Sequence, residues 1–368
     1  MLTDLAAKTK RPAATIPIDE WIPAARTPID CGPAPAFGRH FTPGLLLAEW
    51  REASGWGRPR IAARAALSVD PGAVVFHYGQ AVFEGMKAHR QPDGRLAIFR
   101  LADHADRFVR SAERMAMTPV PPELFAACLT RFVAHQTKAV PNAPGIAYYL
   151  RPLLLGTEAG LGIRASNEFL FVVMGCAVAP YFHGREEAGL RVLVVEEHVR
   201  AAPGGTGAIK AAGNYGRGLL SLKRAKSELG CDQVIWLDAT ERSWIEEMEG
   251  MNIFFVREGT LITPPTSDTI LPGITRSSLL AIAEEEGIVA REEPIRVDDA
   301  LEGIRRGRIT EAFAAGTAAV IAPFAEILRR GESFRFGPER PVATRLHAAL
   351  LARQTGRVAD RRGWLTPA

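Results

Sequence analysis

The sequence is poor in the residues that build disulfides, metal centres and membrane spans. Its 368 residues include only four cysteines, Cys31, Cys128, Cys176 and Cys231, which are widely spaced and form no CxxC pair. Because no histidine and cysteine cluster has metal-ligand spacing, we expect reduced thiols and no metal site. No run approaches the roughly 18 apolar residues of a membrane-spanning helix. The first fifteen residues carry no apolar signal core, so we expect a cytoplasmic protein without a membrane partner.

Lysine is also scarce, and the positive charge comes mainly from arginine. The chain holds 45 lysine and arginine residues, its net charge is +4, and only seven of these cations are lysines. The cations are scattered along the sequence, whereas nucleic-acid binding favours a basic stripe with interleaved aromatic residues. We therefore expect no nucleic-acid partner, while small anionic substrates remain compatible with this charge.

What the chain does contain is typical of a globular protein of two lobes. Hydrophobic residues make up 47% of it and charged residues 23%, as in ordinary soluble domains, and its length favours two domains. Mixed strand and helix patterns in both halves indicate an α/β (α+β) fold. We expect a smaller N-terminal domain over 1–179 with an irregular arm over 1–40, an interdomain loop over 180–189, and a larger C-terminal domain over 190–368.

Hydrophobic periodicity places the individual elements. Apolar runs predict strands at 73–79, 94–101, 146–156, 168–178, 191–199, 233–240, 251–256, 260–264 and 309–316. Helical spacing predicts helices at 103–117, 122–140, 214–230 and 274–287. Asp103 is the expected N-cap of the first helix and Gly230 the expected C-cap of the third. Residues 257–259 are the expected turn of a hairpin.

One lysine stands in an unusual place. Lys210 lies in GAIKAAGNYG (207–216), among glycines and alanines that let a backbone or a flat ligand approach closely. Desolvation lowers the pKa of a lysine, and such a lysine attacks carbonyl groups and forms Schiff bases. The alternative is a structural lysine whose stem packs while its amine reaches solvent.

A Schiff-base lysine is most useful with pyridoxal phosphate (PLP), and the sequence has a candidate for each need of that cofactor. The turns at 271–275 and 316–317 can offer backbone amides to a phosphate, since the first precedes a helix. Glu246 and Glu247 are candidate partners of the ring nitrogen, although a surface loop is an equal interpretation there. Tyr215, five residues after the lysine, can reach the phenolic oxygen.

Taken together, these motifs resemble the bacterial branched-chain amino-acid aminotransferases, which are fold-type IV PLP enzymes. The resemblance runs from about residue 41 to residue 327. It rests on HYGQAVFEGMKA (77–88), YLRPLLLGTEAGLG (149–162), VRAAPGGTGAIKAAGNYG (199–216), CDQVIWLDA (231–239), IEEMEGMNIFFV (245–256), LPGITRSSLL (271–280) and ITEAFAAGTAAVI (309–321). Several long motifs in one order are far more specific than any single glycine turn.

The resemblance implies a two-lobed fold, a homodimer whose second subunit completes the pocket, and a set of roles. Lys210 would be the Schiff-base lysine and proton carrier. The cofactor would be held by Arg107, Tyr215, Glu247, Ile274, Thr275 and Thr317. Amino acids and 2-oxo acids would be held by Tyr78, Phe83, Tyr149, Arg151, Tyr181 and Ala318, with Tyr149 and Ala318 at the α-carboxylate and Arg151 and Tyr78 at the side-chain carboxylate of glutamate. The implied reaction transfers the amino group of leucine, isoleucine or valine to 2-oxoglutarate.

One departure from the family pattern leaves the substrate range open. Glu249 stands where the pattern has a glycine, beside Glu247. A specialised aminotransferase for another apolar amino acid is therefore one alternative. D-amino-acid aminotransferases and aminodeoxychorismate lyases share the fold, but they lack the arginine-proline stretch at 149–162. The alternative from another functional class is a non-catalytic phosphate-binding protein, which would leave the roles of Lys210, Glu247 and Tyr215 unexplained.

Overall fold

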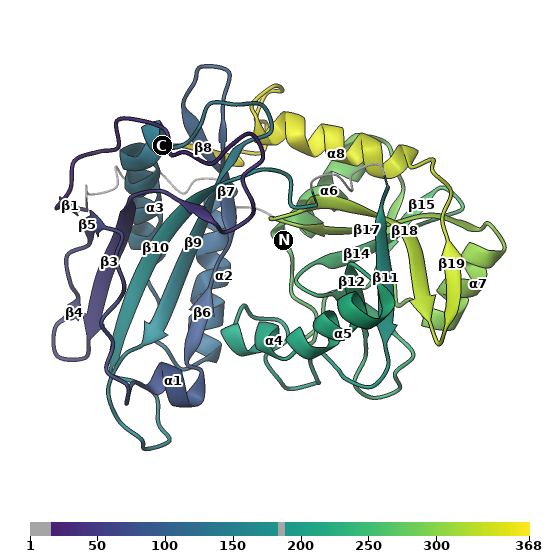
Figure 1. Ribbon diagram of the computed structural model, residues 1–368, viewed down its shortest axis with the longest axis horizontal. Helices are drawn as coiled ribbons and strands as arrows, with labels where there is room; N and C mark the ends of the chain where they lie inside the picture. The colour runs from purple at the N-terminus through teal and green to yellow at the C-terminus, as the bar shows by residue number, and fades with distance from the viewer. Residues whose placement is uncertain (1–15, 183–187) are drawn as a thin grey trace, which may run out of the picture.

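The computed structural model describes residues 16–182 and 188–368. Among these residues the strands form one sheet of 11 and one sheet of 9. Figure 1 shows the sheets in two lobes side by side, and the last helix of the chain lies along the top of the second lobe. The α/β class with two lobes that the sequence predicts is confirmed.

The first lobe is a mostly antiparallel sheet covered by two long helices. Its central order is β1-β5-β3-β10-β9-β7-β8-β20. The strands are Asp19–Glu20 (β1), His40–Phe41 (β2), Gly44–Arg51 (β3), Gly55–Trp56 (β4), Arg60–Ala63 (β5), Ala81–Phe83 (β6), Met86–Arg90 (β7), Leu96–Phe99 (β8), Ala147–Gly156 (β9), Glu168–Val178 (β10) and Leu365–Pro367 (β20). The helices are Val74–Tyr78 (α1), Leu101–Arg114 (α2), Pro122–Gln136 (α3) and the short 3-10 helix Thr137–Ala139 (η1). The core between sheet and helices includes Phe108, Phe125, Phe132 and Phe171.

The second lobe is a mixed sheet in the order β13-β12-β11-β18-β17-β14-β15-β16. Its strands are Leu190–Val195 (β11), Gln233–Leu237 (β12), Ile245–Met248 (β13), Asn252–Arg257 (β14), Thr260–Thr263 (β15), Ala290–Glu292 (β16), Ile309–Gly316 (β17), Val320–Arg329 (β18) and Glu332–Arg335 (β19). Its helices are Ala212–Gly216 (α4), Leu219–Leu229 (α5), Ile274–Glu285 (α6), Val297–Arg305 (α7) and Pro341–Gln354 (α8). Strand β11 pairs in parallel with both β12 and β18.

Two local predictions in the first lobe are wrong. Residues 73–79 do not form a strand: Val74–Tyr78 is a short helix closed by Gly79 in the left-handed conformation. β-branched and aromatic residues favour strands only weakly, and the surrounding structure overrides this preference here. Asp103 is not the N-cap of α2, because the helix begins at Leu101 and the Asp103 carboxylate pairs with Arg100.

Two regions of the second lobe also differ from expectation. The predicted helix at 214–230 is two helices, α4 and α5, which are separated at residues 217–218. Glu246 and Glu247 lie in the buried strand β13 and not in a surface loop. By contrast, Gly230 does close α5 with φ of 62°, and Glu258 and Gly259 turn the β14–β15 hairpin with positive φ, as predicted.

The lobes meet where the chain crosses between them. Val82 of β6 forms an isolated bridge with Ala211, and the Phe83 amide donates to the Lys210 carbonyl at 3.1 Å. The C-terminal strand β20 returns to pair with β8 of the first lobe.

The domain limits at 179 and 190 stay a prediction, and residues 183–187 of the expected interdomain loop lie outside the described residues. No helix in the described part of the chain is long and apolar enough to cross a membrane.

Candidate active site

Lys210 lies between the lobes and is half-buried. Its backbone is held from both sides, because its amide donates to the Ser111 hydroxyl on α2 and its carbonyl accepts from Phe83. The Nζ atom donates to the Tyr215 hydroxyl at 2.7 Å and lies 4.9 Å from the centre of the Phe83 ring. Burial, aided by the nearby Arg107 charge, lowers the lysine pKa from 10.5 to about 8. At pH 7 about a tenth of this amine is therefore neutral, and nucleophilic, which is far more than for a free lysine.

Arg107 stands beside the first turn of α6. Its Nε and Nη2 atoms donate to the Glu84 carboxylate at 2.6 and 2.8 Å, and its Nη1 donates to the Pro272 carbonyl at 3.2 Å. Burial alone would raise the pKa of Glu84, but Arg107 and His104 hold it well below its usual range. Glu84 thus fixes a guanidinium whose remaining N–H groups face the turn at 271–275.

The same turn supplies amides suited to an anion. Gly273 is the N-cap of α6, so Ile274 and Thr275 are its first two helical residues. Their N–H groups have no acceptor within the helix, and the helix dipole is positive at this end. The residues that the sequence predicts for a phosphate, Arg107, Ile274 and Thr275, therefore lie together across the lobe boundary.

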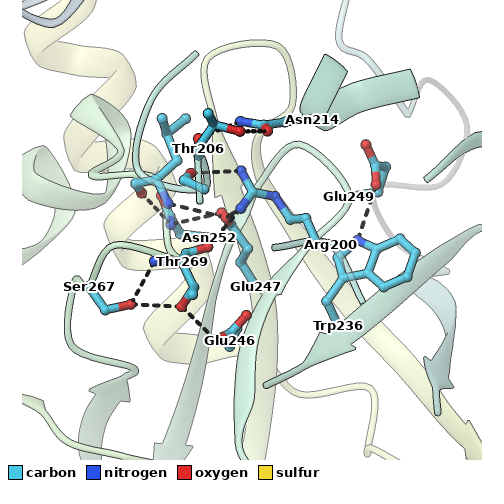
Figure 2. Close-up of polar contacts among 12 residues, drawn as sticks. Arg200, Thr206, Asn214, Trp236, Glu246, Glu247, Glu249, Asn252, Ser267 and Thr269 are labelled. Carbon is cyan, nitrogen blue, oxygen red and sulfur yellow. Dashed lines mark hydrogen bonds and ion pairs between the residues drawn. The ribbon is translucent and has the colours of Figure 1, made fainter. Parts of the chain in front are cut away.

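Glu247 is buried in a network of donors, which Figure 2 shows. Its carboxylate pairs with Arg200 at 2.7 Å and accepts the Leu271 amide at 3.1 Å. Asn252 approaches the other carboxylate oxygen at 3.4 Å and donates to the Leu271 carbonyl at 3.0 Å. Burial raises the pKa of Glu247 to about 7, although Arg200 opposes the rise. The network fixes the carboxylate and leaves it poised between its charged and neutral forms.

Two of the residues predicted for the substrate carboxylates, Tyr149 and Arg151, lie on β9, and Phe83, predicted for the apolar pocket, lies on the neighbouring β6. Arg151 Nη2 donates to the Tyr149 hydroxyl at 3.0 Å, and its guanidinium lies 4.7 Å from the Phe83 ring centre. Gly85 lies so close to the Tyr149 hydroxyl that any Cβ at this position would collide with it. The glycine of the FEG motif therefore makes room for Tyr149, which the sequence predicts at the substrate α-carboxylate.

An aromatic wall continues from Tyr149. The Phe37 ring packs edge-on against Tyr149 at 4.7 Å and against Tyr181 at 5.1 Å between centres. Phe37 belongs to the arm that the sequence predicts to be irregular, so no periodic pattern marks it. Only the tertiary contact with two predicted site residues identifies it as part of the wall.

The remaining predicted residues lie at the edges of this cluster. Thr317 and Ala318 occupy the turn between β17 and β18, and the Ala318 carbonyl accepts from Lys87 at 2.8 Å. Tyr78 is 41% exposed, and its hydroxyl donates to the Leu161 carbonyl at 2.5 Å. No contact among the described residues joins Tyr78 to Arg151, so its role in this subsite stays a prediction.

Arg200 and Glu84, like Phe37, are site residues that the sequence analysis missed. Both lie inside the quoted motifs, Arg200 in VRAAPGGTG and Glu84 in VFEGMKA. Arg200 lies three residues after a glutamate and Glu84 three residues before a lysine, so neither has the charge-free surroundings that singled out Lys210. Their charges are buried, and each is paired with an opposite charge, because an unpaired buried charge costs much free energy.

Glu249, the departure from the family pattern, points away from this network. Its carboxylate accepts the Trp236 indole N–H at 3.1 Å and presses against Gly218. Figure 2 shows it directed toward Trp236 and not toward Glu247. Burial raises its pKa. Among the described residues no contact joins Glu249 to Tyr149 or Arg151, and its side chain ties the turn after β13 to β12.

Comparison with known proteins agrees with this geometry. Residues 81–327 match the family model for amino-transferase class IV. The chain is 42% identical over 334 residues to the probable branched-chain-amino-acid aminotransferase of Streptomyces coelicolor, covering 90% of this chain and 92% of that one. It is 40% identical to branched-chain-amino-acid transaminase 1 of Bacillus subtilis, covering 89% and 92%.

Among solved structures, the branched-chain amino acid aminotransferase from Thermobaculum terrenum in its PLP form superposes with a TM-score of 0.71. It is 25% identical and covers 89% of this chain and 99% of that chain. The chain therefore belongs to the class IV aminotransferase family, and the fold-type IV resemblance expected from its motifs is confirmed.

Proposed function

We propose that the protein is a PLP-dependent aminotransferase that moves the amino group of leucine, isoleucine or valine to 2-oxoglutarate. One observation carries the proposal: a half-buried lysine amine, whose pKa is lowered to about 8, lies near a tyrosine hydroxyl, an arginine beside a helix N-terminus and a buried glutamate. The names of the relatives and the PLP form of the neighbouring structure support the choice of cofactor and substrates.

The residues present fit PLP at each of its polar groups. Arg107, the amides of Ile274 and Thr275, and Thr317 would hold the phosphate. Glu247 would face the ring nitrogen, and Tyr215 would donate to the phenolic oxygen, since burial raises the pKa of its phenol and keeps the proton in place. When bound, PLP supplies an aldehyde for amine capture and an electron sink for the substrate Cα–H bond.

Lys210 would act as both nucleophile and base. Its lowered pKa would leave Nζ able to take the Cα proton of the amino acid and pass it to the cofactor, and to carry a proton in the opposite direction in the second half of the cycle. Tyr215 holds Nζ by the 2.7 Å hydrogen bond, and Ser111 holds the lysine backbone. Arg200 would favour the ionised form of the Glu247 carboxylate near the ring nitrogen, against the rise in pKa that burial causes.

The substrate cluster explains how one site would serve two side chains. Tyr149 and the turn amides at 317–318 would bind the α-carboxylate that both substrates share. Phe83, Phe37 and Tyr181 would pack against a branched aliphatic chain, while Arg151 at their edge would receive the second carboxylate of glutamate. A guanidinium at the rim of an apolar pocket would let the same site bind both the aliphatic side chain and the side-chain carboxylate of glutamate.

We also propose that the protein is a homodimer of the cytoplasm. Phe76, Tyr78, Leu161 and Ile163 are 41–90% exposed, and the Tyr78 hydroxyl binds the Leu161 carbonyl, so the four belong to neighbouring segments. Exposed apolar side chains grouped in this way mark protein interfaces. The four cysteines are unpaired in the structure, which agrees with a reducing compartment.

A half-reaction screen tests the function. Protein loaded with PLP is mixed with single L-amino acids, and the loss of the visible absorption band of the bound cofactor is followed. Leucine, isoleucine, valine and glutamate should discharge the band, and Lys210→Ala should abolish both the band and the turnover. Lys223→Ala, which removes an exposed lysine on α5, is the matched control. A protein that binds no PLP, or that reacts with aromatic amino acids and not with leucine, would contradict the proposal.

A further inference from the structure

A second cavity lies beside the turn that carries Ala318, since the next two residues of the chain line it. Lys87 pairs with Tyr149 across β7 and β9, so the two side chains share one face of the sheet. Alternation along β7 and β9 places His89 and Ala147 on the same face, further from the substrate cluster. Because Lys87 Nζ donates to the Ala318 carbonyl, the turn rests on this lysine and separates the two spaces.

This cavity has a volume of about 680 Å³, within the range of small-molecule sites. It is walled by both lobes, and Lys210, Tyr215 and Glu247 do not line it. The apolar part of its lining includes Ile146, Tyr181, Phe182, Leu190, Val320 and Leu351. Tyr181 also packs against Phe37 of the substrate cluster, so the two spaces share one wall.

The charge of the lining has a single sign. Lys87, Arg90 and Arg357 line the cavity, whereas no aspartate or glutamate does so among the described residues. None of the three cations forms an ion pair in the described part of the chain; Arg90, for example, donates to the carbonyls of Gly94 and Val140. A low-dielectric cavity with uncompensated positive charge attracts anions.

Two buried polar side chains of the lining lack adequate partners. His89 is 6% exposed, and its Nε2 atom has no hydrogen-bond partner among the described residues. Burial and the neighbouring Lys87 lower the pKa of His89 to about 3, so the ring is neutral. Lys87 is 5% exposed and has one carbonyl partner for three N–H groups, and burial lowers its pKa to about 8. Unsatisfied polar groups of this kind are costly, and an anionic ligand would satisfy both.

We infer that this cavity is a second binding site for a small monocarboxylate with an apolar body. Lys87 and His89 take the carboxylate, and the apolar body lies between Ile146 and Leu351. Branched 2-oxo acids belong to this chemical class, so the inference extends the proposed function to a site outside the catalytic cluster. The ligand and the Ala318 carbonyl would both bind the Lys87 ammonium. Ligand binding would therefore affect the turn at 317–318, which is proposed to bind the substrate.

Equilibrium dialysis with hexanoate tests this site while the catalytic cluster is filled. The protein is first saturated with N-(5′-phosphopyridoxyl)-L-glutamate, which joins the cofactor to a substrate. One hexanoate per chain should then bind, and His89→Leu should weaken that binding about tenfold or more. Lys223→Met, a change at an exposed lysine, should leave it unaffected. No bound hexanoate, or equal affinity in the wild type and His89→Leu, would overturn the inference.

A crystal structure with 5-bromopentanoate locates the ligand directly. The anomalous signal of bromine should lie between Ile146 and Leu351, and bromine found only beside Phe83 and Arg151 would overturn the inference. If the chain takes up no phosphopyridoxyl-glutamate, the proposed function fails. The His89→Leu comparison and the bromine position still decide the second site in that case.

Discussion

Removing Lys210 should stabilise the cofactor-free protein. Burial lowers the pKa of this lysine from 10.5 to about 8, which corresponds to a cost of about 3 kcal/mol for holding the charged amine in the folded state. Replacing it with methionine removes that cost and loses the hydrogen bond to Tyr215, which contributes about 1 kcal/mol. Lys210→Met should therefore raise the free energy of unfolding at pH 7 by about 2 kcal/mol.

The pH dependence of this gain follows from the direction of the shift. Below the folded pKa of about 8 the amine is charged in both the folded and the unfolded chain, so the folded protein bears the whole cost. Between about 8 and 10.5 the folded amine loses its proton first, and the cost falls as the pH rises. The gain in the free energy of unfolding from Lys210→Met should be largest at neutral pH and should disappear by about pH 10.

Heat denaturation of the cofactor-free proteins at pH 7 and pH 10 measures this effect. For 368 residues the entropy of unfolding is about 0.8 kcal/mol/K, so a gain of about 2 kcal/mol raises Tm by about 2–3 °C. Lys223→Met, on the exposed face of α5, should change Tm at neither pH. A lower Tm for Lys210→Met at pH 7, or an equal rise at both pH values, would refute the reasoning.

Three further substitutions probe the neighbouring contacts. Glu247→Gln should reduce kcat about 100-fold or more in steady-state assays, because the fixed charge beside the ring nitrogen is lost; an unchanged kcat would remove Glu247 from the site. Gly85→Ala should raise the KM for leucine about tenfold, since the new Cβ displaces the Tyr149 hydroxyl, while Gly337→Ala, where a Cβ meets nothing within 4 Å, should not. Glu249→Gln keeps an acceptor for the Trp236 indole and removes a carboxyl whose pKa burial raises. In urea unfolding the variant should gain stability over the wild type at pH 8 but not at pH 4, and a gain at both would contradict this assignment.

Much of the architecture can be predicted from the sequence because its patterns are long and consistent. The strands β9 and β10, the helices α3 and α6 and the β14–β15 hairpin are all close to their predicted ranges. The failures occur where local preference is weak or misleading. Residues 73–79 have the composition of a strand but form α1, and Glu246 and Glu247 have the composition of a loop but lie in a buried strand.

The candidate site shows the same division. Lys210, Glu247 and the turn at 271–275 stand out in the sequence because a charge in a small-residue stretch, or a glycine turn before a helix, has a direct chemical meaning. Phe37, Arg200 and Glu84 do not stand out, since their importance comes from partners that are distant along the chain.

The sequence by itself determined which chemistry the protein is equipped for: the family, the two-lobed α/β class and the lysine at the centre of the motifs. The tertiary structure alone decided how that lysine is desolvated, which arginine pairs with Glu247, and that Glu249 turns toward Trp236. It also decided that Lys87 donates to the Ala318 carbonyl and lines a cavity whose charged residues are all cations. The physical reason is that a motif specifies residue types, whereas pKa values and charge balance depend on burial and on partners brought together only by folding.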